Sequence, residues 1–381
     1  MEQPCWAFSQ DRGFLMNPDP IKDLRTVNTP LTSESVDHLQ TLAEQLPDLI
    51  RNQQIRSQID ALPVYPIHWL GETDDSHLVE RLFQIYAHLA QAYVWCENDN
   101  PMKHIPAGVA VPFVALAKLV DRPPIIPYAM TALSNYHRLE LQGPIEVENL
   151  RCVQKMIDIP DETWFHIVHI EIEAHAGGAI HACLIATTAA EEANTEAAMT
   201  ALHKVADGID KMIRTFKRMP EGCSPDVYYH TLRPYLFGFD DIVYEGVTEF
   251  GGKPQSFRGE TGAQSTAVPA LKTFLGLQHA PGGLSEHLEI MQDYMPKPHR
   301  EFLHAINPTL IRDFVIQQKN ASLRDAYNHC LDRIVSFRSL HLHFAHSYIA
   351  SKVENPMGTG GTDFMHWLKQ LRDETKEQLI S

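Results

Sequence analysis

The sequence of 381 residues predicts an all-α fold, and three observations lead to this class. Apolar residues recur at intervals of three and four along several long segments, which is the pattern of a helix with one buried face. Stretches in which apolar and polar residues alternate, the pattern of a half-buried strand, are scarce. Hydrophobic residues make up 44% of the chain and charged residues 21%, so the helices have enough apolar material for a large core.

The first part of the chain begins with a predicted loop and continues with two predicted helices. Prolines at 18, 20 and 30 interrupt residues 1–30, which we therefore expect to be irregular. Helical spacing of Val, Leu and Ile predicts a helix over Ser33–Ile59 and another over Leu78–Trp95.

A third apolar segment, Val109–Val120, is predicted to be a helix that begins at Pro112. The prolines at 123 and 124 end it, because proline lacks an amide donor and excludes the helical conformation from the residue before it. A short extended stretch and a helix over Ala129–Tyr136 are expected next.

In the second part of the chain, Glu192–Met219 carries the clearest apolar stripe and is predicted to be a long helix. Five glycines and a proline predict a loop over Gly246–Gly262. Asn307-Pro308 has the residues of a helix start. A last long helix is expected over Ser322–Ala350, opened by the capping-box variant Ser322-x-x-Asp325.

The segment His166–His175 carries two conflicting signals. His169, Glu171, Glu173 and His175 alternate with apolar residues, which taken alone predicts a strand. The helical patterns on both sides and the small residues of 174–179 favour a helix packed closely against a neighbour. We therefore predict a helix here.

Charge and cysteine usage exclude several classes of protein. Asp and Glu total 48 against 32 Lys and Arg, and the resulting net charge of −16 argues against binding to nucleic acid. The N-terminus shows no signal peptide, and prolines interrupt the longest apolar stretch, Ile105–Ala117, so no membrane segment is expected. The six cysteines are scattered without a CxxC pair, which predicts reduced thiols in a cytoplasmic protein.

Histidine is abundant, with 21 residues, and one histidine lies in the middle of an apolar stripe. His341 shares a face of the last predicted helix with Ile334, Phe337, Phe344 and Tyr348. A core histidine with a hydrogen-bonded neighbour explains this pattern, and so does an axial haem ligand. Zinc is disfavoured because it requires three or four protein ligands.

Two further features are compatible with chemistry. His166 and His169 lie one helical turn apart, but neither a second Glu-x-x-His nor an H-E-x-x-H motif accompanies them, so a multi-ligand metal site is not favoured. Arg233 lies among three tyrosines, where it either stacks on their rings or pairs with a substrate carboxylate.

Nine short motifs, taken in order, resemble the indoleamine 2,3-dioxygenase family. They run from residue 110 to residue 363, and the most specific are the last two. The motifs are Ala110-Val-Pro112, Pro123-Pro-Ile-x-x-Tyr128, Leu232-Arg-x-Tyr235, Val243-Tyr-Glu-Gly246, Phe257-x-Gly-x-x-x-x-Gln-Ser265, Tyr294-Met-Pro-x-x-His-Arg-x-Phe-Leu303, Leu323-Arg-x-Ala-Tyr327, Ser336-x-Arg-Ser-x-His341 and Gly358-Thr-Gly-Gly-Thr-Asp363.

The resemblance implies an all-α haem protein of two domains. A small helical domain, residues 1–157, would cover the distal side of the haem, and a larger helical domain, residues 158–381, would carry the iron ligand. The implied cofactor is haem b. The implied reaction inserts O₂ across the indole C2–C3 bond of L-tryptophan or a related indoleamine and yields N-formylkynurenine. The oligomeric state is left open.

The resemblance also assigns roles to individual residues. His341 matches the proximal iron ligand, and Arg338 and Thr261 match residues at the haem. Arg233 matches the arginine that pairs with the substrate carboxylate. The residues implied to contact the substrate are Tyr128, Phe165, Tyr228, Arg233 and Thr359.

Four positions depart from the family pattern. His169 replaces a small hydroxyl residue on the distal side and is similar to the distal histidine of tryptophan 2,3-dioxygenases, where it would accept a hydrogen bond from the indole nitrogen. Tyr228 replaces a phenylalanine, Glu260 a glycine and Lys272 an aspartate. These departures keep an alternative open: a haem protein that binds an indole or O₂ without dioxygenation, as a sensor or as an enzyme like the tryptophan-rearranging haem enzyme of pyrrolnitrin biosynthesis.

Overall fold

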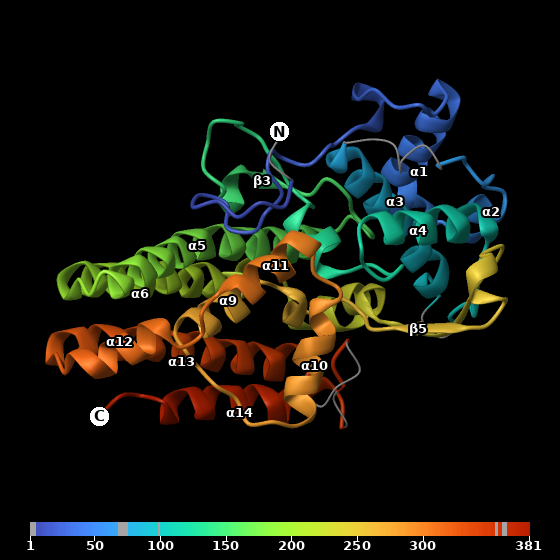
Figure 1. The fold of residues 1–381 in the computed structure, drawn as a ribbon. Helices are drawn as coiled ribbons and strands as arrows, with labels where there is room; N and C mark the ends of the chain where they lie inside the picture. Colours follow the sequence, from blue (N-terminus) through green and yellow to red (C-terminus); the bar gives the residue numbers. More distant parts are fainter. Residues whose placement is uncertain (1–4, 68–74, 98–99, 355–356, 360–363) are drawn as a thin grey trace.

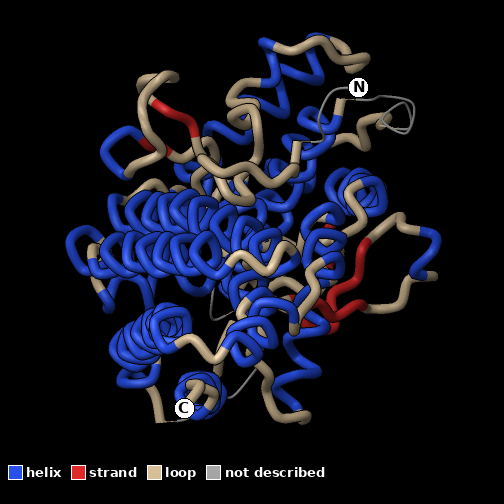
Figure 2. Tube along the Cα trace, turned by 60° about the vertical axis from the view of Figure 1, so that its left-hand side comes forward, coloured by secondary structure: helices blue, strands red, loops and turns tan. Residues whose placement is uncertain are grey.

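The computed structural model describes residues 5–67, 75–97, 100–354, 357–359 and 364–381, and most of them are helical (Figures 1 and 2). This confirms the predicted all-α class. The helices of the first part are α1 (Ser33–Arg51), α2 (Ile55–Asp60), α3 (Ser76–Trp95) and α4 (Ala107–Leu119). Those of the second part are α5 (Pro160–Glu191), α6 (Thr195–Lys217), α7 (Met219–Gly222), α8 (Pro225–Val227), α9 (Ala267–Phe274), α10 (Gly283–Gln292), α11 (Lys297–Ala305), α12 (Leu310–Gln318), α13 (Ala321–Tyr348) and α14 (Phe364–Glu377).

Short 3₁₀ and π turns and short strands connect these helices. The π turns are η3 (Ala129–Leu133) and η5 (Tyr228–Leu232). The 3₁₀ turns are η1 (Leu24–Thr26), η4 (Val147–Asn149), η6 (Arg233–Leu236), η7 (Thr248–Phe250), η8 (Gly262–Gln264) and η9 (Ala350–Lys352). The strands are β1 (His104–Ile105), β2 (His137–Arg138), β3 (Leu150–Arg151), β4 (Phe239–Tyr244) and β5 (Gln255–Phe257).

Four long helices form the frame of the second part. Helix α5 packs on α6, α6 on α13, and α13 on α14 (Figure 1). Small residues let α5 and α6 approach each other closely, as the sequence predicts for α5. Gly208 of α6 lies against Ala179 of α5, and a Cβ at Gly208 would lie only 2.7 Å from Cβ of Ala179. The segment His166–His175 lies inside α5, so the predicted helix is confirmed there.

Several predicted helix boundaries are wrong. The predicted helix Ser33–Ile59 is divided into α1 and α2, because Gln53 has a left-handed backbone with φ of 58°. Helix α4 begins at Ala107, so Pro112 lies inside the helix and not at its start. Pro106 precedes the helix with φ of −61° and ψ of 151°, and Pro112 is tolerated although it cannot donate to the carbonyl of Gly108.

Caps explain the boundaries in the second part. Asn194 accepts a hydrogen bond from the amide of Ala197, so α6 begins at Thr195 and not at Glu192. Asn307 does not cap a helix: its side chain accepts from the amide of Thr309, 3.2 Å away, in a turn that precedes α12. Asn320, not Ser322, caps α13.

Two features were missed by the sequence patterns. The predicted loop Gly246–Gly262 contains η7 and β5, which pairs antiparallel with β4, while β1 pairs parallel with β4. Helix α14 was not predicted, although its apolar residues at 364, 367, 368 and 371 have helical spacing. The strand pairing matters for the site because it places residues 258–266 beside α5.

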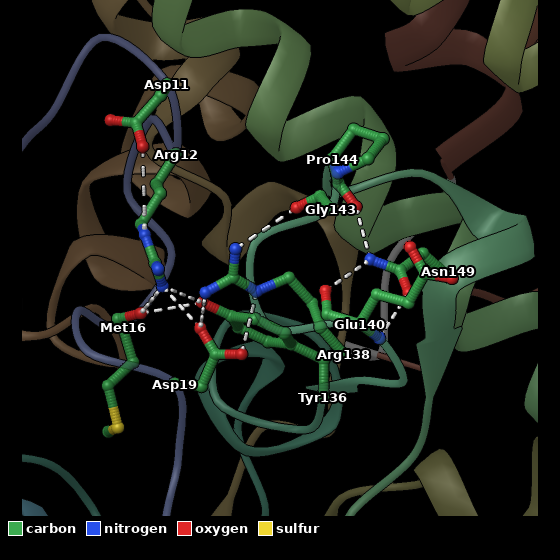
Figure 3. A network of polar contacts seen from close by, with 10 residues as sticks. All are labelled: Asp11, Arg12, Met16, Asp19, Tyr136, Arg138, Glu140, Gly143, Pro144 and Asn149. Atoms are coloured by element: carbon green, nitrogen blue, oxygen red, sulfur yellow. Dashed lines mark hydrogen bonds and ion pairs between the residues drawn. The ribbon is translucent and has the colours of Figure 1, made fainter.

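The N-terminal segment is irregular, as predicted, but a polar network holds it in place (Figure 3). The carboxylate of Asp19 accepts from Arg12 at 2.7 Å and from Arg138 at 2.9 and 3.0 Å. The hydroxyl of Tyr136 donates to the carbonyl of Met16. The same segment packs against α5, where a Cβ at Gly13 would lie 2.3 Å from the Glu173 carbonyl oxygen.

Buried apolar side chains from Trp6 to Tyr348 form one continuous core. None of the helices in the described ranges is long and apolar enough to span a membrane. The predicted division at residue 157 stays a prediction.

Candidate active site

A cavity of about 530 Å³ lies among α5, α6, α9, α13 and the loop that follows β5. Eight of the nine residues named from the sequence line it, and only Arg233 does not. The eight are Tyr128, Phe165, His169, Tyr228, Thr261, Arg338, His341 and Thr359. A volume of this size is typical of pockets for cofactors and small-molecule ligands.

His341 projects into the cavity from the C-terminal third of α13. Its imidazole has no hydrogen-bond partner among the described residues, and burial lowers its pKa to about 4. The nearby His169 and Arg338 contribute to the same lowering. The imidazole is therefore neutral at pH 7 with its lone pair available, which is the state that a metal ligand needs. His343 and His346 of the same helix border a different, shallow hollow.

His169 projects from α5, and its tautomer follows from one contact. Nδ1 lies 2.7 Å from the carbonyl oxygen of Phe165. Because a carbonyl only accepts, Nδ1 carries the proton and Nε2 is left as an acceptor. Burial lowers the pKa of His169, so the neutral form prevails at pH 7.

Aromatic rings form one wall of the cavity. The ring centroid of Phe165 lies 4.5 Å from that of His169 and 5.0 Å from that of Tyr228, and Tyr228 contacts Tyr348 at 5.8 Å. Tyr128 meets His169 edge-on at 6.2 Å. Such rings offer a planar aromatic ligand stacking and edge contacts.

Arg233 lies just outside the cavity wall in the turn η6. Its guanidinium is buried, stacks on Tyr229 and Phe237, and donates to the carbonyl of Met357. Its Nε has no partner. The arginine is thus positioned behind the segment 357–359, which also contributes Thr359 to the cavity.

Two buried acids line the cavity, and the sequence patterns did not single them out as site residues. Glu173 follows His169 by one turn of α5, and its Oε1 accepts from Tyr128 at 3.0 Å and Ser265 at 2.5 Å. Glu260 accepts from Thr131 at 3.3 Å. Burial raises the pKa of both carboxyls to about 7. Helical spacing from His169 was the signal for Glu173.

Three basic residues gather at another part of the wall: Lys272, His279 and Arg338. Arg338 donates to the carbonyl of Leu371 at 2.6 Å and to Thr375, so it ties α13 to α14. Nη2 of Arg338 also donates to Nε2 of His279, 3.3 Å away. Nδ1 of His279 therefore carries the ring proton and donates to Glu374 at 2.6 Å. Burial lowers the pKa values of Lys272 and Arg338, and a bound anion such as a carboxylate would raise them again by stabilising the charged forms.

The donor set fits haem better than a bare metal ion. In the described ranges no group of three or more His, Cys, Asp or Glu residues could hold a metal ion. Haem iron needs only one protein ligand, and His341 provides one in an apolar cavity of suitable size. The basic residues 272 and 338 match the charge of the porphyrin carboxylates.

Comparisons with known proteins agree with this geometry. The family model "Indoleamine 2,3-dioxygenase" matches residues 3–357. Indoleamine 2,3-dioxygenase 1 of Rattus norvegicus is 31% identical to this chain, covering 99% of the chain and 95% of the relative. Indoleamine 2,3-dioxygenase 2 of Homo sapiens is 29% identical, covering 98% and 95%. Indoleamine 2,3-dioxygenase acdA of Aspergillus candidus is 30% identical, covering 84% and 85%.

The match extends over almost the whole chain and includes the segments that carry His169, Arg233, Glu260 and His341. Residues 360–363 of the last sequence motif lie outside the described residues. With the fold, the cavity and the family model in agreement, the chain belongs to the indoleamine 2,3-dioxygenase family.

Proposed function

We propose that this chain is a haem-dependent dioxygenase that inserts O₂ across the indole C2–C3 bond of L-tryptophan or a related indoleamine. The single observation that carries the proposal is the position of His341. It is a buried, neutral histidine without a hydrogen-bond partner among the described residues, and it faces a cavity lined by aromatic rings. Family membership supplies the class of reaction.

His341 would ligate the iron of haem b, and Arg338, Thr261 and Lys272 would border the porphyrin. When bound, the haem supplies the redox chemistry of O₂. The protein's part is to orient the substrate and to exclude water from the site.

The aromatic wall would hold the indole. Phe165, Tyr228 and Tyr128 provide the rings on which it packs. Nε2 of His169 would accept a hydrogen bond from the indole N–H, since Nδ1 is committed to the carbonyl of Phe165. His169 therefore acts by positioning and is not required as a base.

Arg233 would pair with the substrate carboxylate. In this structure its Nη2 donates to Met357, so pairing requires the segment 357–359 to shift or the carboxylate to take the place of that carbonyl. Thr359, whose hydroxyl donates to the Glu260 carbonyl at 2.5 Å, would close the cavity over the ligand.

The test is to reconstitute the purified chain with haem, reduce it without oxygen, and add L-tryptophan and O₂ together. We expect a Soret band on reconstitution and the absorbance of N-formylkynurenine after oxygen is added. A Soret band without product would contradict dioxygenation and support the ligand-binding alternative. Absence of haem uptake would contradict the proposal altogether.

The small-domain and large-domain division at residue 157 is part of this proposal. Eight residues predicted from the sequence line the cavity. Tyr128 comes before residue 157, and the other seven come after it. A partly overlying first domain would account for this arrangement.

A further inference from the structure

Glu260 lines the cavity with an acidic group for which the protein provides little compensation. It follows β5 in a loop held by a hydrogen bond from its own amide to the Leu236 carbonyl at 3.0 Å. The side chain is 5% exposed. Among the described residues, its carboxylate accepts a single hydrogen bond, from Thr131 at 3.3 Å. A buried carboxylate is costly unless a cation or several donors accompany it.

No cation of the described residues accompanies this carboxylate. None of the ion pairs among these residues involves Glu260 or Glu173, and within the described ranges the Glu260 carboxylate accepts no hydrogen bond besides the one from Thr131. Burial consequently raises the pKa of Glu260 to about 7. A cationic ligand in the cavity would lower it again and stabilise the ionised form.

A second acid reinforces the negative charge. Glu173 is 2% exposed and lines the same cavity, and its Oε2 has no hydrogen-bond partner in the part of the chain that the structure describes. The phenol of Tyr128 donates to Oε1 of Glu173 and lies in the electrostatic field of both carboxylates. This part of the wall is therefore suited to a hydrogen-bond donor with positive charge.

Glu260 and Arg233 carry the two charges that would complement those of an amino acid, and Tyr228 and the segment 357–359 link them. Tyr228 lies in the electrostatic field of both residues, because Arg233 lowers the pKa of its phenol and Glu260 raises it. The segment 357–359 contacts both, because the Met357 carbonyl accepts from Arg233 and the Thr359 hydroxyl donates to the Glu260 carbonyl.

The two charges are not equally accessible. Glu260 lines the cavity, whereas Arg233 lies behind the wall with its guanidinium engaged by Met357. The cavity wall near Tyr128 and Tyr228 thus presents an anion directly to a ligand, and the cation is reached only through the segment 357–359.

From this arrangement we propose that Glu260 is a specificity-determining residue whose carboxylate binds the protonated amine of the substrate. The proposal rests on the proposed function for the position of the indole. It defines the preferred ligands as indoles with a cationic amine on a short side chain, whether or not they carry a carboxylate.

Four ligands test the proposal against the haem-reconstituted full chain under anaerobic conditions. Tryptamine and indole-3-ethanol have side chains of the same length, one cationic and one neutral. L-tryptophan carries both charges, and indole-3-propionate carries only the carboxylate. Affinities are measured by calorimetry and by the change in the haem spectrum, so that no turnover is needed.

We expect the unmodified protein to bind tryptamine at least about tenfold more tightly than indole-3-ethanol, the size of one charge-assisted hydrogen bond. E260Q should remove most of this preference and lower the affinity for L-tryptophan by a similar factor. The affinity for indole-3-propionate should stay the same or rise. E260G, which restores the family's residue, should act in the same direction.

Two results would overturn the proposal. One is equal binding of tryptamine and indole-3-ethanol by the unmodified protein, a comparison that does not depend on any variant folding. The other is an equal loss of affinity for all four ligands in E260Q, which would indicate a structural role of Glu260. E249Q is the control for the loss of a carboxylate as such. It removes the carboxylate of the exposed ion pair between Glu249 and Lys118.

Binding and turnover separate this inference from the proposed function. A preference for amine ligands without N-formylkynurenine formation would support the role of Glu260 in binding the amine and would contradict dioxygenation. Formation of N-formylkynurenine without an amine preference would contradict the role of Glu260 and leave dioxygenation standing.

Discussion

His169 of α5 and His341 of α13 border the same cavity, and the ring of Phe216 contacts both. The centroid of Phe216 lies 6.5 Å from that of His169 and 6.0 Å from that of His341. Both imidazoles are buried and neutral at pH 7. His169 is hydrogen-bonded through Nδ1, whereas His341 has no hydrogen-bond partner in the described part of the chain. The two imidazoles are therefore suited to different roles.

The replacement H341A should abolish stable haem binding, because it removes the histidine proposed to ligate the iron. The measurement is the Soret band after reconstitution and gel filtration. H343A is the matched control, since His343 lies on the same helix but borders a different hollow. An unchanged Soret band in H341A would disprove the assignment of the ligand.

The replacement H169A should lower kcat for L-tryptophan by about tenfold, the effect of one lost hydrogen bond that positions the indole. In the unmodified protein, 1-methyl-L-tryptophan should be a poorer substrate than L-tryptophan, because it leaves Nε2 of His169 unpaired. H169A should narrow this difference. A total loss of activity with haem still bound would instead make His169 an obligatory base.

The replacement R233A should raise KM for L-tryptophan by about 10- to 100-fold and change kcat less, because a charge-assisted contact with the carboxylate is lost. Tryptamine has no carboxylate and should be little affected, so it serves as the internal control. If R233A harms both substrates equally, the contact of Arg233 with Met357 is structural and not a means of binding the carboxylate.

The stability of the haem-free protein should fall as the pH rises from about 4.5 to about 7. Burial raises the pKa values of Glu173 and Glu260 from 4.5 to about 7, so the folded state binds more protons than the unfolded state in this range. Each shift corresponds to an upper limit of about 3 kcal/mol.

The double variant E173Q/E260Q should have a flatter profile of unfolding free energy over this pH range, measured by urea denaturation. E249Q corrects for the removal of a surface carboxylate. A profile as steep as that of the unmodified protein would show that other groups cause the pH dependence.

Sequence periodicity predicted those helices whose signals are local. The apolar stripe of α3 was recognised because side chains three and four residues apart share a face whatever surrounds them. The helix over His166–His175 was recognised from the helical patterns on both sides and from the small residues of 174–179, because its own residues alternate like those of a strand. Helix ends were less accurate. Gln53 interrupts a continuous pattern with one left-handed residue, and Asn320 caps α13 two residues before the predicted cap. The short strands were missed because β1 and β4 pair across some 140 residues of chain.

The sequence by itself determined the all-α class, the family and eight residues that line one cavity. These follow from spacing and from ordered motifs, which are properties of the chain alone. Only the tertiary structure decided which charges remain without partners. Glu173 is an ordinary acid in the sequence and Glu260 is a departure from the family pattern, and both become notable because folding buries them without a cation among the described residues. Arg233 is likewise a motif residue whose side chain folding directs to Met357 and away from the cavity. Burial and pairing depend on segments distant in the chain, and local patterns do not contain that information.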